Sequence, residues 1–181
     1  MAARGVHFAI TDVQRFGLES QRTDIDRISF VQNEIESLWD TDFLQETDHA
    51  WDAIHRCLGE FPPNTPWFYP VDPSLGAYAL PDDYGTYPLK LCVLGGRRLM
   101  NSDENYFIRL IEPEQVIDLV PSLEELNFAE IRDRYHKHCK GAWPEFGNDD
   151  LAYTWDYFQA LRAFFQRMAG NGRTIIFTAD Q

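Results

Sequence analysis

Strand-like segments lie at both ends of the chain and near its middle, with helical patterns between them. In residues 5–11, GVHFAIT, and residues 104–111, ENYFIRLI, side chains alternate with the two-residue period of a β-strand. Residues 173–180, RTIIFTAD, are predicted to form a closing strand. The sequence therefore predicts an α+β fold, with several helices packed on a small mixed sheet of N-terminal, middle and C-terminal strands.

Helical patterns cover most of the remaining sequence. Apolar residues recur at threes and fours from Thr23 to Leu38 and from about Asn148 to Ala169, which is typical of amphipathic helices. Other helices are predicted from after Thr41 to Gly59, from Pro113 to a break before Pro121, and from Ser122, which forms a capping-box pattern with Glu125. Residues 88–96 favour a short helix slightly over a buried strand.

The segment of residues 61–88 interrupts these patterns. It contains seven of the ten prolines and seven aromatic residues, so no regular element can run far through it. We expect an irregular loop that packs on the body of the protein, with a ligand lid as the alternative. Trp67 and Tyr69 in this loop are candidate binding residues.

Length and composition favour one compact domain spanning residues 1–181. The chain has 181 residues, of which 44% are hydrophobic and 14% aromatic, enough apolar surface to form a core. An odd number of cysteines, three, suits reduced thiols in a reducing compartment. The first residues have no signal-peptide core and no long apolar run occurs, so we expect a cytoplasmic protein outside the membrane.

The charge of the chain limits its partners. Its formal net charge is -13, from 29 acidic residues against 16 lysines and arginines. Such a field repels phosphate backbones, so nucleic-acid binding is not expected. It suits docking to a protein partner with a basic surface, while most of the acidic residues simply keep the surface solvated. The oligomeric state is not predicted.

The segment DHAWDAIHRCLG, residues 48–59, combines polar and aromatic residues on a predicted helix. Helical spacing places Leu44, Trp51 and Leu58 along the centre of the buried stripe, and Trp51 is also a candidate binding residue. Asp48, Asp52 and His55 then share one flank, at separations where side chains meet. Either a carboxylate orients the imidazole for proton transfer, or these groups are satisfied at the margin of the core; the second interpretation is favoured.

Other chemical signatures are absent. The sequence lacks G-x-S-x-G, HExxH and CxxC motifs, and LGGRR is too short for a phosphate-binding loop. We therefore expect no metal and no cofactor. Arg97 and Arg98, which follow the two glycines, are candidate contacts for an anion or carboxylate.

Taken in order, GVHFAIT, DHAWDAIHRCLG, LKLCVLGG, FIRLIEPEQVIDLV, DYFQALRAFFQRMAGNGRTIIF and TADQ resemble the YfbM-like family, a bacterial domain family of undefined function. The most specific part is the family's D-x-x-W-D/H-x-x-H/L pattern ending in leucine and glycine, which falls here on Asp48, Trp51, Asp52, His55, Leu58 and Gly59. The resemblance implies a single α+β domain from a bacterial cytoplasm and supplies no reaction. The loop at residues 61–88 departs from shorter relatives.

Three functions follow as hypotheses. The first is a non-enzymatic binding or interaction protein, for example an immunity or antitoxin partner, since the chain is small and acidic and has no catalytic signature. The second is a hydrolase or transferase that uses His55 with Asp52 or Asp48. The third is a sensor that binds an anionic metabolite through the aromatic loop and the arginine pair. The sequence favours the first.

Overall fold

The computed structural model describes residues 4–62, 84–101, 106–142 and 146–180. Within them the elements follow in the order β1 (Gly5–Ile10), α1 (Asp12–Glu19), α2 (Asp24–Phe30), a π-helical turn (Val31–Ile35), a 3-10 turn (Glu36–Leu38), β2 (Leu44–Asp48), α3 (Ala50–Gly59), a 3-10 turn (Leu89–Cys92), β3 (Arg97–Arg98), β4 (Tyr106–Ile111), α4 (Pro113–Glu124), α5 (Phe128–His138), α6 (Asn148–Ala169) and β5 (Thr174–Asp180). The predicted α+β class is confirmed, as are the three predicted strands and the long helix at residues 148–169.

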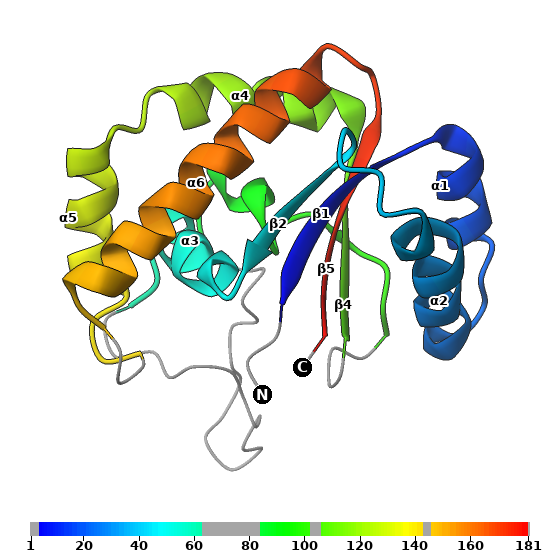
Figure 1. Ribbon diagram of the computed structural model, residues 1–181, viewed down its shortest axis with the longest axis horizontal. Helices are drawn as coiled ribbons and strands as arrows, with labels where there is room; N and C mark the ends of the chain where they lie inside the picture. Colours follow the sequence, from blue (N-terminus) through cyan, green and yellow to red (C-terminus); the bar gives the residue numbers. More distant parts are fainter. Residues whose placement is uncertain (1–3, 63–83, 102–105, 143–145, 181) are drawn as a thin grey trace.

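The strands form one open sheet in the order β2-β1-β5-β4-β3. The first and last strands pair at its centre, from Gly5 opposite Ala179 to Ile10 opposite Thr174. Every described pairing is antiparallel, whereas a mixed sheet was predicted. The reason is visible at β1, where α1 and α2 carry the chain down and back, so that β2 begins beside the end of β1 and runs against it (Figure 1).

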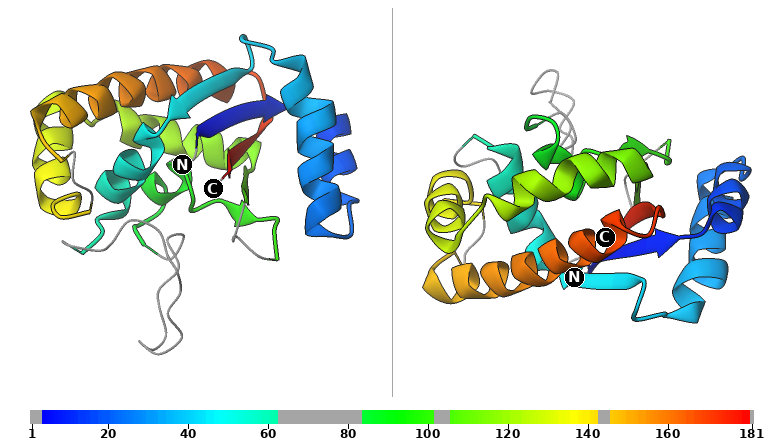
Figure 2. Two further views of the ribbon diagram at one scale, coloured as in Figure 1. Left: turned by 60° about the horizontal axis from the view of Figure 1, so that its bottom comes forward. Right: turned by 90° about the horizontal axis from the view of Figure 1, so that it is seen from above.

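Helices cover both faces of this sheet. In Figure 1 α1 and α2 lie on one side of the sheet and α3, α4, α5 and α6 on the other, and Figure 2 shows the same layers from two further directions. Along β1, Phe8 and Ile10 belong to the core beneath α1 and α2, while Ala9 belongs to the core on the other side. Because both faces are covered, every residue of β1 and β4 is buried, although antiparallel sheets often leave one face to solvent.

Two predicted helices differ from the structure near the start of the chain. The helix predicted from Thr23 to Leu38 ends as an α-helix at Phe30 and continues as π-helical and 3-10 turns. The wider π-helical turn shifts the register of the apolar stripe, which leaves Leu38 exposed. The helix predicted after Thr41 is wrong over its first part, because Leu44–Asp48 pair with β1 as an edge strand.

The remaining differences lie around prolines. α4 continues through Pro121 to Glu124 instead of ending before the proline, and the next helix begins at Phe128. The predicted capping box of Ser122 is therefore wrong, and Asn127 caps α5 through the same reciprocal hydrogen bonds with Glu130. The helix favoured for residues 88–96 is reduced to a 3-10 turn of four residues.

Candidate functional site

The predicted polar flank of the helix does not form as one group. α3 begins at Ala50, so Asp48 precedes it, at the end of β2. Asp48 has a left-handed backbone conformation with φ of 43°, which lets the chain turn sharply from strand to helix. Its side chain is 26% exposed, whereas those of Asp52 and His55 are buried.

All ten residues of α3 are buried, and its polar side chains find partners inside the protein. Arg56 Nε donates to Asp52 Oδ2 at 2.7 Å. Burial raises the pKa of Asp52, and the guanidinium of Arg56 opposes that shift. The ring of His55 packs edge-on against Phe61, with 5.3 Å between the ring centres. Asp52 and His55 thus lie in the interior of the protein.

Trp51 anchors α3 on the sheet. Its side chain is fully buried, as predicted, and contacts the rings of Phe107 and Phe177 from β4 and β5. Strand β1 passes so close to the indole that a Cβ atom on Gly5 would lie 2.6 Å from Trp51 Cδ1. Trp51 was also a candidate binding residue, but in this structure it is packed in the core and presents no surface to solvent.

Asp48 instead borders a cleft of about 220 Å³ at the end of the sheet where β1 begins and β5 ends. Four carboxylates line this cleft: Glu36 from the 3-10 turn, Glu46 and Asp48 from β2, and Asp180 from β5. Trp39 and Tyr106 provide its aromatic surface, and Arg4 is the basic residue among its lining side chains. We refer to it as the acidic cleft.

Hydrogen bonds fix the position of these polar groups. Tyr106 donates its hydroxyl to Glu36 Oε1 at 2.5 Å, and burial together with this carboxylate raises the pKa of the phenol. Tyr153 donates to Asp48 Oδ2 at 2.8 Å, while Arg4 Nε lies 3.5 Å from Asp48 Oδ1. The phenols therefore stay protonated as donors, and the cleft keeps a negative charge that a single arginine offsets in part.

Unusual backbone conformations border the same cleft. Trp39, like Asp48, is left-handed, with φ of 40°, and the π-helical turn Val31–Ile35 directly precedes Glu36. Such conformations are costly for residues other than glycine and often occur at functional sites. Their presence on two sides of the acidic cleft makes this the candidate functional site.

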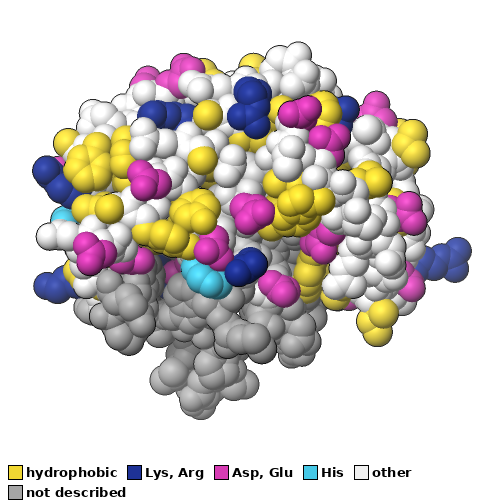
Figure 3. Space-filling view, viewed as in Figure 1, with side chains coloured by type: hydrophobic (Ala, Val, Ile, Leu, Met, Phe, Trp, Pro, Cys, Tyr) yellow, Lys and Arg dark blue, Asp and Glu magenta, His cyan; other side chains and the backbone are white. Residues whose placement is uncertain are grey.

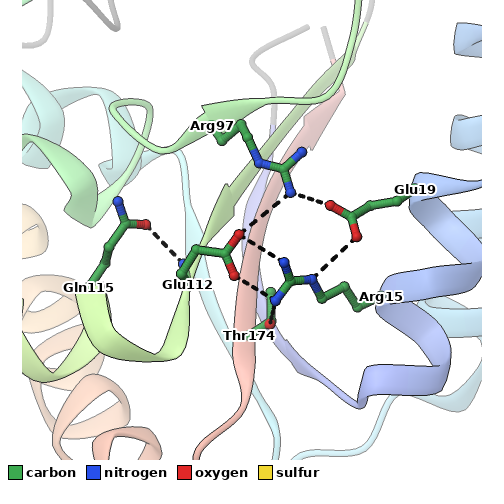
Figure 4. Close-up of polar contacts among 6 residues, drawn as sticks. All are labelled: Arg15, Glu19, Arg97, Glu112, Gln115 and Thr174. Atoms are coloured by element: carbon green, nitrogen blue, oxygen red, sulfur yellow. Dashed lines mark hydrogen bonds and ion pairs between the residues drawn. The ribbon is translucent and has the colours of Figure 1, made fainter.

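One of the two arginines predicted to bind an anion, Arg97, contacts carboxylates of the protein itself. Arg97 pairs with Glu19, and its Nη2 lies 3.6 Å from Glu112 Oε1 (Figure 4). Arg15 closes a ring, with Nη1 at 2.6 Å from Glu112 Oε2 and Nε at 3.3 Å from Glu19 Oε2. This ring joins α1 to β3 and to the start of α4. Arg98, next to Arg97 on β3, lies opposite Arg109 in the sheet.

Most residues of the acidic cleft were not recognised in the sequence. Only Asp48 was, and it was assigned to a helix. The others come from segments far apart in the chain, and none stands in a local motif, so no sequence signal short of the strand pairing could have grouped them. Trp67, Tyr69 and most of the predicted loop at residues 61–88 lie outside the described residues.

Two features do not occur among the described residues. No helix among them is long and apolar enough to cross a membrane. No group of three or more histidine, cysteine, aspartate or glutamate side chains in that part of the chain is arranged to hold a metal ion.

Comparisons with known proteins identify the family. Residues 1–178 match the model of a domain of unknown function, DUF1877, and the chain belongs to this family. Among solved structures, the chain is similar to YfbM from Escherichia coli, a protein of unknown function. The TM-score is 0.61 at 16% identity, over 97% of this chain and 99% of that chain, which shows a shared fold. No curated protein matches. The YfbM-like resemblance is confirmed.

Proposed function

We propose that this member of the DUF1877 family is a binding protein whose acidic cleft receives a basic side chain of a protein partner. The observation that carries the proposal is the convergence of four carboxylates on one cleft of about 220 Å³. A guanidinium or ammonium group is the natural occupant, because a partly enclosed site strengthens its attraction to carboxylates.

Aromatic groups beside the carboxylates support the same occupant. Trp39 is 44% exposed and borders the cleft, so its ring is available to stack on a guanidinium. Arg4 shows how such a group would sit, since its guanidinium already lies beside Asp48 with a side chain that is 76% exposed. A partner's arginine would replace this weak surface pair with a more enclosed one.

The alternatives have less support. Asp52 and His55 are 2% and 1% exposed, so a hydrolase or transferase reaction at these residues would need α3 to separate from its neighbours. A sensor that binds an anion through Arg97 would have to compete with Glu19 and Glu112. An immunity or antitoxin role is one form of the binding that we propose, and a toxin-like gene beside this one would support it.

A short peptide tests the cleft directly. We would titrate acetyl-Ala-Arg-Ala-amide into ¹⁵N-labelled protein and follow the amide and indole resonances of Trp39. The peptide with citrulline in place of arginine is the neutral control. We expect shifts at Trp39 with the arginine peptide only. Replacing Arg4 by alanine should tighten binding about two- to fivefold, since a competing pair worth up to about 1 kcal/mol is removed.

Paired variants separate the cleft from general acidity. Glu46→Gln/Asp180→Asn removes two charges from the cleft, whereas Asp133→Asn/Asp156→Asn removes two exposed charges from α5 and α6. The first pair should abolish the shifts and the second should preserve them. Equal binding by both variants, or by the citrulline peptide, would show that the cleft is not the site.

A further inference from the structure

A second acid-lined depression lies on α2 and the π-helical turn that follows it, away from the acidic cleft. This groove has a volume of about 250 Å³ and is lined by Gln21, Asp26, Ser29, Phe30, Asn33 and Glu34. It forms because Gly17 lets α1 approach the ring of Phe30, where a Cβ atom would lie 2.5 Å from Phe30 Cζ. The close approach places an aromatic ring beside two carboxylates.

Apolar side chains also lie on the solvent side of α1, the helix that approaches Phe30 of the groove at Gly17. Val13 and Phe16 are 82% and 68% exposed and lie three residues apart, so they form one patch on the helix. Leu18, the buried residue of α1, points in nearly the opposite direction on the helical wheel. α1 is thus apolar on both sides, and its outer side is left without a covering element among the described residues.

The charge around this patch is net negative. Between Thr11 and Glu34 the chain has five acidic residues and three arginines. Two of these arginines are engaged internally, Arg15 in the ring with Glu112 and Arg27 with Asp24. Figure 3 shows apolar and acidic side chains next to each other over α1 and α2, at the right of the view. The surface therefore combines apolar contact area with a net negative field.

We propose that this α1–α2 face, defined by Val13, Phe16, Asp26, Phe30 and Glu34, docks a basic amphipathic helix of a partner protein. Two packed helices, one with exposed apolar residues and the other with an acid-lined groove, offer a surface for a third helix whose apolar residues contact Val13 and Phe16. Lysine or arginine side chains of the partner reach Asp26 and Glu34 in the groove. A second copy of this chain is a poor occupant, because two such negative faces would repel each other.

This surface is separate from the acidic cleft and extends the proposed function by a second contact and a second kind of ligand. A helix lying along α1 and α2 would not enter the cleft, whose carboxylates belong mainly to strands at the end of the sheet. A partner that uses both surfaces would gain affinity by linking two weak contacts.

A synthetic helix is the probe for this surface. We would use a fluorescein-labelled peptide of about 18 residues, with leucines at helical spacing on one face and lysines on the other. Binding would be measured by fluorescence anisotropy at about 0.15 M salt. A second peptide, with every leucine replaced by glutamine, keeps the charge and removes the apolar face. We expect the wild-type protein to bind the first peptide at least about tenfold more tightly than the second.

Variants locate the contact. Val13→Ser/Phe16→Ser should weaken binding of the amphipathic peptide about tenfold or more, whereas Ile117→Ser, at an exposed isoleucine of α4, should leave it unchanged. Asp26→Asn/Glu34→Gln should weaken binding and flatten its salt dependence, and Asp133→Asn/Asp156→Asn should not. The cleft variant Glu46→Gln/Asp180→Asn should bind the peptide normally, so that failure of one proposal is distinguishable from failure of the other.

Several results would overturn the docking proposal. Absence of binding to the wild-type protein would do so. Equal binding of the glutamine peptide would also do so, because it would show that charge alone explains the attraction. Equal weakening by Ile117→Ser and by Val13→Ser/Phe16→Ser would show that the patch is not specific. A dimer of the wild-type protein that Val13→Ser/Phe16→Ser dissociates, measured by analytical ultracentrifugation, would assign the face to a second copy instead.

Discussion

Arg56 and Asp52 form an ion pair inside the protein, with 2.7 Å between Nε and Oδ2 and both side chains almost wholly inaccessible to solvent. The pair lies within one helix, at positions four residues apart, so α3 carries both charges into the core when it packs. A buried charge is costly unless its partner remains, which makes the pair a requirement of the fold rather than an exposed reactive group.

Removing either partner should therefore destabilise the protein strongly. We expect Arg56→Met and Asp52→Asn each to lower the free energy of unfolding by about 3–5 kcal/mol, measured by urea denaturation. The double variant Asp52→Leu/Arg56→Met removes both charges. Its loss of unfolding free energy should be smaller than the sum of the losses in the two single variants. Single variants that cost less than about 1 kcal/mol would mean that the pair contributes no more than a surface ion pair.

His7 should make stability depend on pH. It is fully buried in β1, its Nε2 lies 2.8 Å from the carbonyl oxygen of Cys92, and burial lowers its pKa from 6.5 to about 4. The unfolded chain binds a proton near pH 6.5, whereas the folded protein does not until about pH 4. The contribution of neutral His7 is complete above pH 6.5 and is lost as the pH falls toward 4, a change of about 3 kcal/mol.

Urea denaturation at intervals between pH 4 and 7 would measure this contribution. His7→Gln keeps an amide donor for the Cys92 carbonyl but does not titrate, so its unfolding free energy should vary less over the window. His136→Gln, at an exposed position of α5, is the matched control and should retain the wild-type slope. An unchanged slope in His7→Gln would assign the acid sensitivity to other groups.

Local patterns in the sequence predicted those elements whose structure depends on near neighbours. α6 forms where apolar residues recur at helical spacing, β1 and β4 form where the sequence alternates, and β5 forms at a short run rich in threonine, isoleucine and phenylalanine. The burial of Trp51 was also predictable, because the helical stripe around it survives in α3. In each case a short segment contains enough apolar surface to determine its own conformation.

The missed features depend on contacts between distant segments. Leu44–Asp48 become a strand because they pair with β1, some forty residues earlier, and no helical pattern can reveal that competition. The acidic cleft has the same origin, since Glu36, Glu46 and Asp180 meet only after the sheet has formed. The sequence predicted a candidate site on one face of a helix, whereas the structure places it at the end of a sheet. Asp48 belongs to both sites.

Gly5 should not tolerate a larger residue. A Cβ atom at this position would lie 2.6 Å from Trp51 Cδ1 and 2.8 Å from Thr47 Oγ1, closer than packed atoms approach. Because Trp51 is held by rings on β4 and β5, the indole cannot move aside freely. We expect Gly5→Ala to lower the unfolding free energy by about 1–3 kcal/mol. Gly172→Ala is the comparison. A Cβ atom there would have no atom within 4 Å, but φ is 63°, so its effect on the unfolding free energy measures backbone strain without a steric clash.

The three thiols should be unreactive in the folded protein. Cys57, Cys92 and Cys139 are buried, and burial raises the pKa of Cys92 well above its usual range. Cys57 and Cys139 lie with their Sγ atoms 3.8 Å apart, and their mutual hydrogen bond and burial raise the pKa of Cys139. Since the thiolate is the reactive form, we expect almost no reaction with Ellman's reagent at neutral pH in the native state.

Unfolding should release all three thiols together. In guanidinium chloride we expect three equivalents to react, and in native protein the rate should follow the fraction of unfolded molecules as denaturant is raised. Fast reaction of one thiol in the native state would mean that its helix opens locally. Rapid reaction of Cys139 in particular would indicate that the end of α5 separates from α3 without global unfolding, because Cys139 caps α5 and contacts Cys57 of α3. Cys92→Ala would remove one equivalent and leave this distinction intact.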